Sequence, residues 1–138
     1  MKILLIEDSR FLRTAVEKSL TKAGYEVNGV SDGREGLALA RKSLPDLILL
    51  DMMLPGLEGT CVLKELKQDA FTSHIPVIVL TGLSQKNEVK LKNAGAAAYI
   101  EKSSINLDKN ADMLLQAIVH VMDASCEVAH ASGGETAK

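Results

Sequence analysis

Two short runs of the sequence are almost entirely apolar, and they restrict the fold more than any other feature. They are DLILL (46–50) and PVIVL (76–80). A strand that is apolar at nearly every position, instead of at every second one, is buried on both faces. Such strands are typical of the centre of a parallel sheet, which needs helices against both sides. We therefore expect an α/β domain whose parallel sheet is covered on both faces.

The rest of the chain alternates between further apolar runs and segments of helical period. Additional strands are predicted at 2–6, 25–30 and 97–101, and the more polar run YEVNGV (25–30) suits an edge strand. Helices are predicted at 9–22, 33–43, 58–68, 85–94 and 109–123. The stripe predicted for the first helix consists of Phe11, Leu12, Ala15, Val16 and Leu20.

The composition indicates one domain without a strong overall charge. The 138 residues are 46% hydrophobic, and the formal net charge of -2 gives no field that would attract nucleic acid or a membrane. Cys61 and Cys126 lack metal-ligand spacing, and Cys61 is expected as a small core or boundary residue of a helix. No signal-peptide core or membrane-length run is present, so the expected location is cytoplasmic. Residues 1–123 are expected to form the domain and 124–138 a disordered tail.

The residues at which the predicted strands end form an unusual set. The first strand ends at Glu7-Asp8, the third at Asp51 and the fourth at Thr81, while the fifth runs into Lys102. Right-handed crossovers bring these ends to one edge, where ligands bind in open parallel sheets. Each acidic residue alone could be a helix N-cap or a solvated turn. Two carboxylates roughly 5 Å apart repel each other by about 3 kcal/mol, so a group of three carboxylates requires a compensating cation. Oxygen ligands of this kind favour Mg²⁺ as the first choice and Mn²⁺ as the second.

Four motifs stand in a fixed order along the chain: ILLIEDS (3–9), PDLILLDMMLPGLEG (45–59), IPVIVLTG (75–82) and NAGAAAYIEKS (93–103). In this combination, the sequence resembles the receiver domain of two-component response regulators, the family that includes the chemotaxis regulator. The resemblance covers about residues 2–122. It implies a doubly wound, flavodoxin-like fold with five parallel strands in the order 2-1-3-4-5 and five helices. It also implies a phosphoacceptor signalling module rather than an enzyme.

The same resemblance implies a role for each site residue. Asp51 would accept a phosphoryl group from a histidine kinase or a histidine phosphotransfer protein. Asp8 would bind Mg²⁺ directly and Glu7 through water, and the backbone carbonyl of Met53 would be a further ligand. Phosphoryl transfer depends mainly on positioning and charge neutralisation, which such a set of groups supplies.

Two further residues complete the implied site, and a third implies a switch. Thr81 would donate its hydroxyl to one phosphoryl oxygen, and Lys102 would pair with another. On phosphorylation Thr81 would move toward the phosphoryl group, and Tyr99 would rotate inward. By itself Tyr99 is also a plausible half-buried aromatic of an edge strand. The altered surface would be the 85–123 face, which would contact an effector protein or a second copy of the chain.

The sequence departs from the family pattern in two places. Ser103 follows Lys102, where the family usually has proline, and the loop before the last helix is longer. Met53 and Leu83, two residues after Asp51 and Thr81, are apolar. We hypothesise that they slow self-dephosphorylation by leaving an attacking water without a hydrogen-bonding partner, although both side chains could simply cover the neighbouring core.

Four readings of function remain open at this point. The first is a stand-alone receiver, which we expect to signal through protein contacts without binding nucleic acid directly, because residues 124–138 contain no DNA-binding pattern. A fragment of a longer regulator is the open alternative to a stand-alone protein. The second is a phosphate relay or sink between two histidine proteins. The third is a Mg²⁺ phosphohydrolase of the haloacid-dehalogenase type, which expects an aspartate where Met53 stands. The fourth is a constitutive binding module, which the intact set of site residues argues against.

Overall fold

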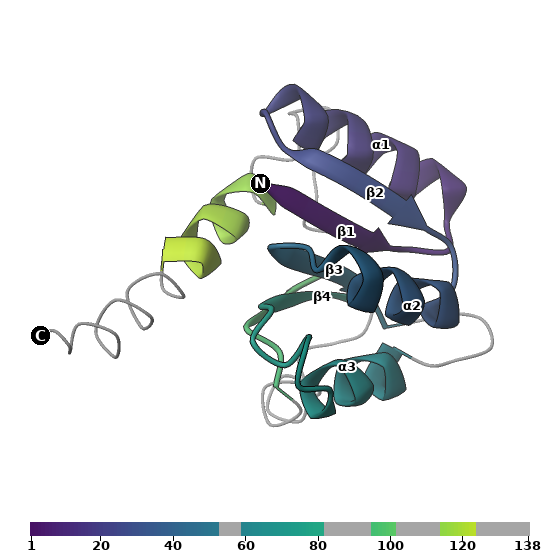
Figure 1. Ribbon diagram of the computed structural model, residues 1–138. Coiled ribbons are helices and arrows are strands. Elements are labelled where there is room, and N and C mark those ends of the chain that lie inside the picture. The colour runs from purple at the N-terminus through teal and green to yellow at the C-terminus, as the bar shows by residue number, and fades with distance from the viewer. Residues whose placement is uncertain (53–58, 82–94, 102–113, 124–138) are drawn as a thin grey trace, which may run out of the picture.

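Five parallel strands form one sheet, with helices on both of its faces (Figure 1). This is a computed structural model, and it describes residues 1–52, 59–81, 95–101 and 114–123. The strands are β1 (Lys2–Ile6), β2 (Glu26–Val30), β3 (Leu47–Asp51), β4 (Val77–Thr81) and β5 (Ala98–Glu101), in the order β2-β1-β3-β4-β5. The predicted parallel sheet and strand order are confirmed.

Three labelled helices and a fourth helical stretch surround the sheet in the described part of the chain. They are α1 (Arg10–Lys22), α2 (Gly33–Ser43), α3 (Gly59–Gln68) and residues 114–123. The predicted bounds differ from these by at most one residue for the first three. The helix predicted at 85–94, the start of the one predicted at 109–123 and the predicted tail lie outside the described residues.

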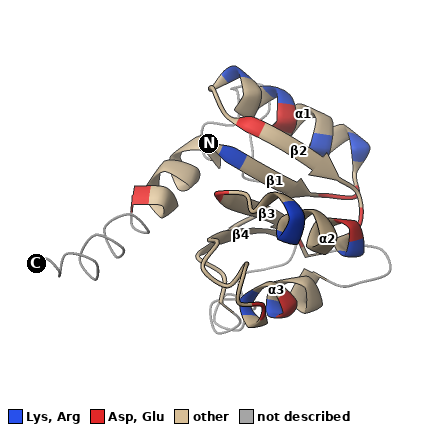
Figure 2. Cartoon of the chain, viewed as in Figure 1, with Lys and Arg blue, Asp and Glu red and all other residues tan. Residues whose placement is uncertain are grey.

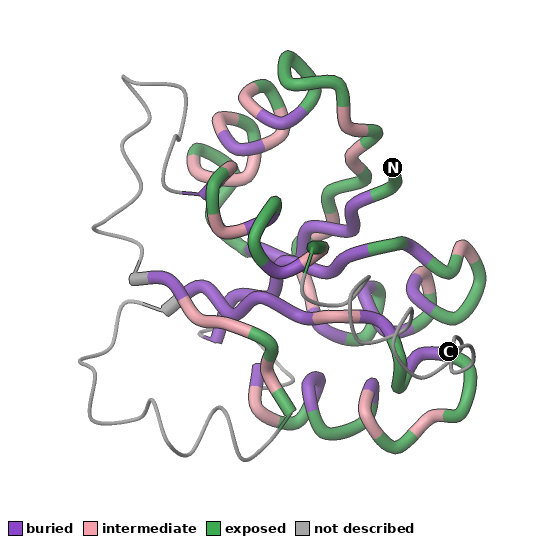
Figure 3. Tube along the Cα trace, turned by 90° about the vertical axis from the view of Figure 1, so that its left-hand side faces the viewer, coloured by how far each residue is buried: buried purple, intermediate pink, exposed green. Residues whose placement is uncertain are grey.

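Alternate residues of the strands build two separate cores, one on each face of the sheet. Even-numbered residues of β1 and β3 pack against Leu37 of α2 and Leu63 of α3. Odd-numbered residues of the same strands pack against Val16 of α1 and Ile118 of the last helical stretch. In Figure 3 the strands form the buried centre, and exposed residues follow the outer sides of the helices. Leu47 to Leu50 of β3 are buried, as the apolar run predicts, and Asp51 at the end of the strand is buried as well.

Two expectations about individual side chains were wrong. Phe11 is 79% exposed, because the buried residues of α1 are Val16 and Leu20 and a residue five positions before Val16 points about 140° away from it. Cys61 lies in α3 as expected, but it is exposed and not part of the core. The buried stripe of that helix runs through Val62, Leu63 and Leu66.

The loop between α3 and β4 closes the edge of the sheet opposite the strand carboxyl ends. Lys67 donates from Nζ to two carbonyl oxygens of this loop at 3.1 and 2.7 Å, and burial lowers its pKa. Asp69 accepts from the backbone N–H of Phe71 at 2.8 Å and from Arg41 Nε at 2.6 Å. The hydrogen bond from Phe71 and, to a smaller extent, the one from Arg41 hold the pKa of Asp69 below its usual value. None of the described helices is long and apolar enough to cross a membrane.

Candidate functional site

Three carboxylates meet where β1 and β3 end. Glu7 and Asp8 directly follow β1, and Asp51 is the last residue of β3. One oxygen from each of the three lies within 4.8 Å of the other two. Glu7 and Asp51 are 0% exposed, whereas Asp8 is exposed to solvent. The structure thus brings together three residues that the sequence placed at strand ends 43 and 44 positions apart.

Glu7 is held through its side chain and through both of its backbone polar groups. Its N–H donates to the carbonyl oxygen of Val30, at the end of β2, at 3.0 Å. Its carbonyl oxygen accepts from Arg13 Nη1 of α1 at 2.9 Å. Its carboxylate Oε2 accepts from the backbone N–H of Ser9 at 3.0 Å. Since Ser9 is also the N-cap of α1, with its side chain accepting from the N–H of Leu12, the start of this helix is built around Glu7.

Asp51 is fixed by the strand to which it belongs and by a close helix. It pairs in register with Leu80 of β4, and the next N–H, that of Met52, donates to the Leu80 carbonyl at 3.1 Å. The first residue of α3 is Gly59, whose N–H donates to the Met52 carbonyl at 3.3 Å. A Cβ at Gly59 would lie 2.6 Å from the Asp51 carbonyl oxygen. Glycine therefore permits the helix to begin directly against the end of β3.

The other predicted site residues are described only in part. Thr81 is the last residue of β4, one position beyond the register partner of Asp51. Tyr99 of β5 pairs in register with Val79 and is half-buried against the core on the α2–α3 face. Met53 and Lys102 lie outside the described residues. The backbone thus places Thr81 at the same edge as Asp51.

The donor set suits a small, hard divalent cation. At 4.8 Å and an effective dielectric near 20, each carboxylate pair repels by about 3.5 kcal/mol, which a cation bound between the oxygens would offset. Carboxylate oxygens favour Mg²⁺, Mn²⁺ or Ca²⁺ over softer metals. In Figure 2 acidic residues mark the chain where it leaves β1, while the helices carry charges of both signs. The residues present therefore fit a divalent ion of this class.

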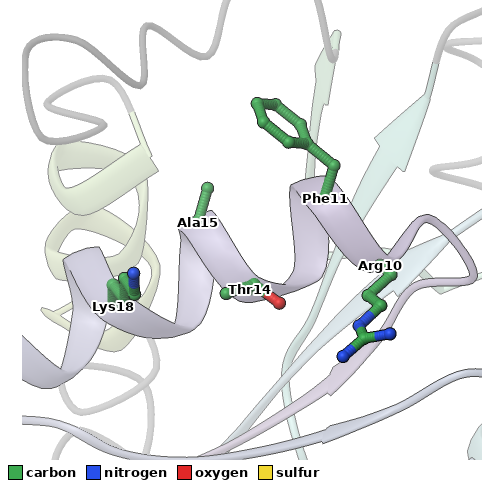
Figure 4. Close-up of a pocket in the computed structure, with 5 residues that line it drawn as sticks. All are labelled: Arg10, Phe11, Thr14, Ala15 and Lys18. Atoms are coloured by element: carbon green, nitrogen blue, oxygen red, sulfur yellow. The ribbon is translucent and has the colours of Figure 1, made fainter.

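A shallow, mainly apolar depression lies on the outside of α1, close in sequence to Asp8. It is lined by Arg10, Phe11, Thr14, Ala15 and Lys18. Figure 4 shows Phe11 and Ala15 projecting from the same side of the helix, with the cationic residues at its two ends. Aromatic residues and arginine are enriched in protein–protein interfaces, and Phe11 and Arg10 are residues of these two kinds.

The open parallel sheet, with an acidic cluster at the carboxyl ends of its central strands, defines a doubly wound domain with its site at the topological switch point. Residues 3–118 match the family model of the response regulator receiver domain. The chain therefore belongs to the receiver domain family of response regulators, which are signalling modules of two-component systems.

Similar proteins include receivers with and without additional domains. PilH of Pseudomonas aeruginosa is 38% identical over 102 residues, which cover 73% of this chain and 84% of PilH. Response regulator PleD of Caulobacter vibrioides is also 38% identical over 102 residues, but the match spans only 22% of PleD. The crystal structure of a CheY-like response regulator receiver domain protein from Methanospirillum hungatei JF-1 superposes with a TM-score of 0.80 and 31% identity, covering 91% of this chain and 96% of that one.

Several residues that position the carboxylates through their contacts were not predicted from the sequence. Ser9 and Gly59 carried a local signal, because a serine before a helical stripe and a glycine at a helix start are ordinary boundary residues. Arg13 carried no such signal. Its contact with Glu7 joins α1 to the end of β1, and a cationic side chain within a helix usually indicates a solvated face.

Proposed function

We propose that this receiver domain accepts a phosphoryl group on Asp51, in a Mg²⁺-dependent reaction, from a histidine kinase or a histidine phosphotransfer protein. The observation that carries the proposal is the position of Asp51 at the end of a fully buried strand, within 4.8 Å of two further carboxylates. A carboxylate used only for solubility would lie on the surface, since burial without compensation is costly. Cytoplasmic location is part of the proposal, and its support is the match to the receiver domain family.

The reaction needs one nucleophile and well-placed charges. An Asp51 oxygen attacks the phosphorus of phosphohistidine, the P–N bond breaks, and the imidazole leaves with the bonding electron pair. The bound cation would neutralise charge on the phosphoryl oxygens, and Glu7, Asp8 and Asp51 would hold it, with the Met53 carbonyl proposed as a further ligand. The chain's own contribution is orientation, because β4 and α3 hold the backbone next to Asp51 in place.

Thr81 and Lys102 are proposed to bind the phosphoryl oxygens, and Thr81 and Tyr99 to transmit the change. The support is their place in the family motifs and the position of Thr81 one residue beyond the Asp51 register partner. The half-buried Tyr99 lies on the neighbouring strand. Phosphorylation is proposed to alter the 85–123 face and so its contact with an effector protein or a second copy.

The donor protein is proposed to dock on the depression of α1 that contains Phe11. This helix starts two residues after Asp8, so a partner covering it would reach the acidic cluster. Phe11 supplies an exposed apolar anchor, and Arg10 and Lys18 favour an acidic rim on the partner.

The experiment that tests the function is incubation with Mg²⁺ and acetyl phosphate, followed by intact-mass analysis. We expect one added phosphate on the wild type and none on Asp51→Ala. Asp46→Ala is the matched control, since Asp46 precedes the same strand at its opposite end and accepts from the Lys2 N–H at 2.8 Å. If Asp51→Ala gains phosphate as the wild type does, Asp51 is not the acceptor. If the wild type gains none, a panel of histidine kinases is the second donor, and failure there overturns the proposal.

The lifetime of the phosphorylated protein is proposed to be long because Met53 and Leu83 offer no hydrogen bond to an attacking water. The support is the sequence alone, since both residues lie outside the described part of the chain. The test is to time loss of phosphate from the wild type, Met53→Asn and Leu83→Glu. The idea fails if neither substitution speeds the loss.

A further inference from the structure

We infer that Arg13 is a positioning residue for the metal-binding carboxylates. Its side chain lies over β2, where Gly29 has no side chain and so leaves room for it. The inference rests on the proposed function only in taking the acidic cluster as a cation site. Its basis is a set of contacts at Glu7 and Gly29 that joins α1 to the end of β1 and to β2.

The first contact is the hydrogen bond from Arg13 Nη1 to the Glu7 carbonyl oxygen at 2.9 Å. The side chain of Arg13 is only 19% exposed, so this bond is largely shielded from competing water. The same residue, Glu7, is bound on its N–H by Val30 and on its carboxylate by Ser9. Arg13 is the single side chain among these three groups, and it fixes the peptide that links Glu7 to Asp8.

The second observation explains why Arg13 lies across β2. A Cβ at Gly29 would lie 3.1 Å from Arg13 Cδ and would overlap the carboxylate of Glu17. Glu17 lies one turn after Arg13, and its Oε1 is 4.0 Å from Arg13 Nε. The absence of a side chain at Gly29 therefore leaves room for both chains over the strand, with Glu17 beside the guanidinium.

Replacing Arg13 with a neutral residue would affect cation binding in two ways. A guanidinium near a cation site repels the cation, so removing its charge alone would strengthen metal binding. Removing a group that orients the ligands would weaken binding, typically about 10-fold or more. The two roles predict opposite changes, and this makes the assignment testable with metal alone.

The experiment measures Mn²⁺ affinity by the electron paramagnetic resonance signal of the free ion, with Mg²⁺ as competitor, in protein that has not been phosphorylated. We expect Arg13→Met to bind Mn²⁺ about 10-fold more weakly. Arg13→Lys, which keeps the charge and one donor, should recover part of the loss. Glu17→Gln is the control, because it leaves the bond to Glu7 in place, and its affinity should stay within about twofold of the wild type.

Hydrogen exchange in metal-free protein separates positioning from a general loss of stability. We expect Arg13→Met to speed exchange of the Ser9 and Glu7 amides more than that of amides in β3. Equal or tighter Mn²⁺ binding by Arg13→Met would overturn the inference, and so would weaker binding with uniformly faster exchange. If the wild type binds Mn²⁺ but never accepts phosphate, the proposed function fails. The Mn²⁺ affinities and exchange rates of the variants still decide whether Arg13 positions the carboxylates.

Discussion

The acidic cluster predicts that removing one carboxylate stabilises the metal-free protein and abolishes most of its stabilisation by Mg²⁺. The perturbation is Asp51→Asn, which keeps the shape of the side chain and removes its charge. Asp51 and Glu7 are both 0% exposed, and one oxygen of each lies within 4.8 Å of the other. Their repulsion at an effective dielectric near 20 is about 3.5 kcal/mol, and solvent reduces the smaller contribution from exposed Asp8.

Part of this energy is lost to relaxation and to the other interactions that Asp51 makes. We therefore expect Asp51→Asn to raise the free energy of unfolding in EDTA by about 1–3 kcal/mol. For a domain of 138 residues this corresponds to roughly 4–12 °C in Tm. Mg²⁺ at ten times its Kd should stabilise the wild type by about 1.4 kcal/mol, and the variant by much less.

The assay is urea and thermal unfolding of both proteins in EDTA, in MgCl2 and in NaCl of equal ionic strength. Asp46→Asn is the matched control, because Asp46 lies at the other end of the same strand, roughly 16 Å away. It should show neither the gain nor the Mg²⁺ effect. The reasoning is refuted if Asp51→Asn is less stable than the wild type in EDTA, or if Mg²⁺ and NaCl stabilise the wild type equally.

Three further predictions follow from other parts of the structure. Gly59→Ala should cost about 1–3 kcal/mol in urea unfolding and slow phosphorylation by acetyl phosphate, because the new Cβ would meet the Asp51 carbonyl at 2.6 Å; a neutral effect would contradict the close packing. Phe11→Ala should slow transfer from a kinase but leave the acetyl phosphate rate and Tm unchanged, since Phe11 is 79% exposed; equal slowing with both donors would rule out a docking role. Asp69 has a folded pKa below its ordinary 3.8, so its stabilisation is present above pH 3.8 and lost as the pH falls through the folded value. In acid titrations of stability, Asp69→Asn should therefore lose less than the wild type below pH 3.8, and parallel curves would contradict the assignment.

The sheet and the acidic cluster were predictable because each depends on a local pattern. The apolar runs at 46–50 and 76–80 require burial on both faces, and the polar run at 25–30 suits the edge that β2 occupies. Once the strands are parallel, their carboxyl ends share one edge, so Glu7, Asp8 and Asp51 meet without any knowledge of side-chain packing.

The errors arose where two neighbouring positions on a helix were both plausible core positions. Phe11 precedes Leu12 and Cys61 precedes Val62, and a shift of one residue turns a side chain by 100° about the helix axis. Hydrophobicity alone favours Phe11 for the core. The sheet nevertheless contacts the line of Val16 and Leu20, which leaves the ring of Phe11 outside.

The part of the site that could not be predicted is also the part that determines its rigidity. Glu7 is bound by β2, by the start of α1 and by Arg13, and Asp51 is bound between β4 and the first residue of α3. Moving the backbone that carries either carboxylate would break several hydrogen bonds at once, at a cost of about 1 kcal/mol or more for each. Phosphorylation of Asp51 should therefore leave the backbone at Glu7 and Asp51 nearly unchanged. The conformational response that we propose would then begin at the end of β4 and on β5, where Thr81 and Tyr99 lie.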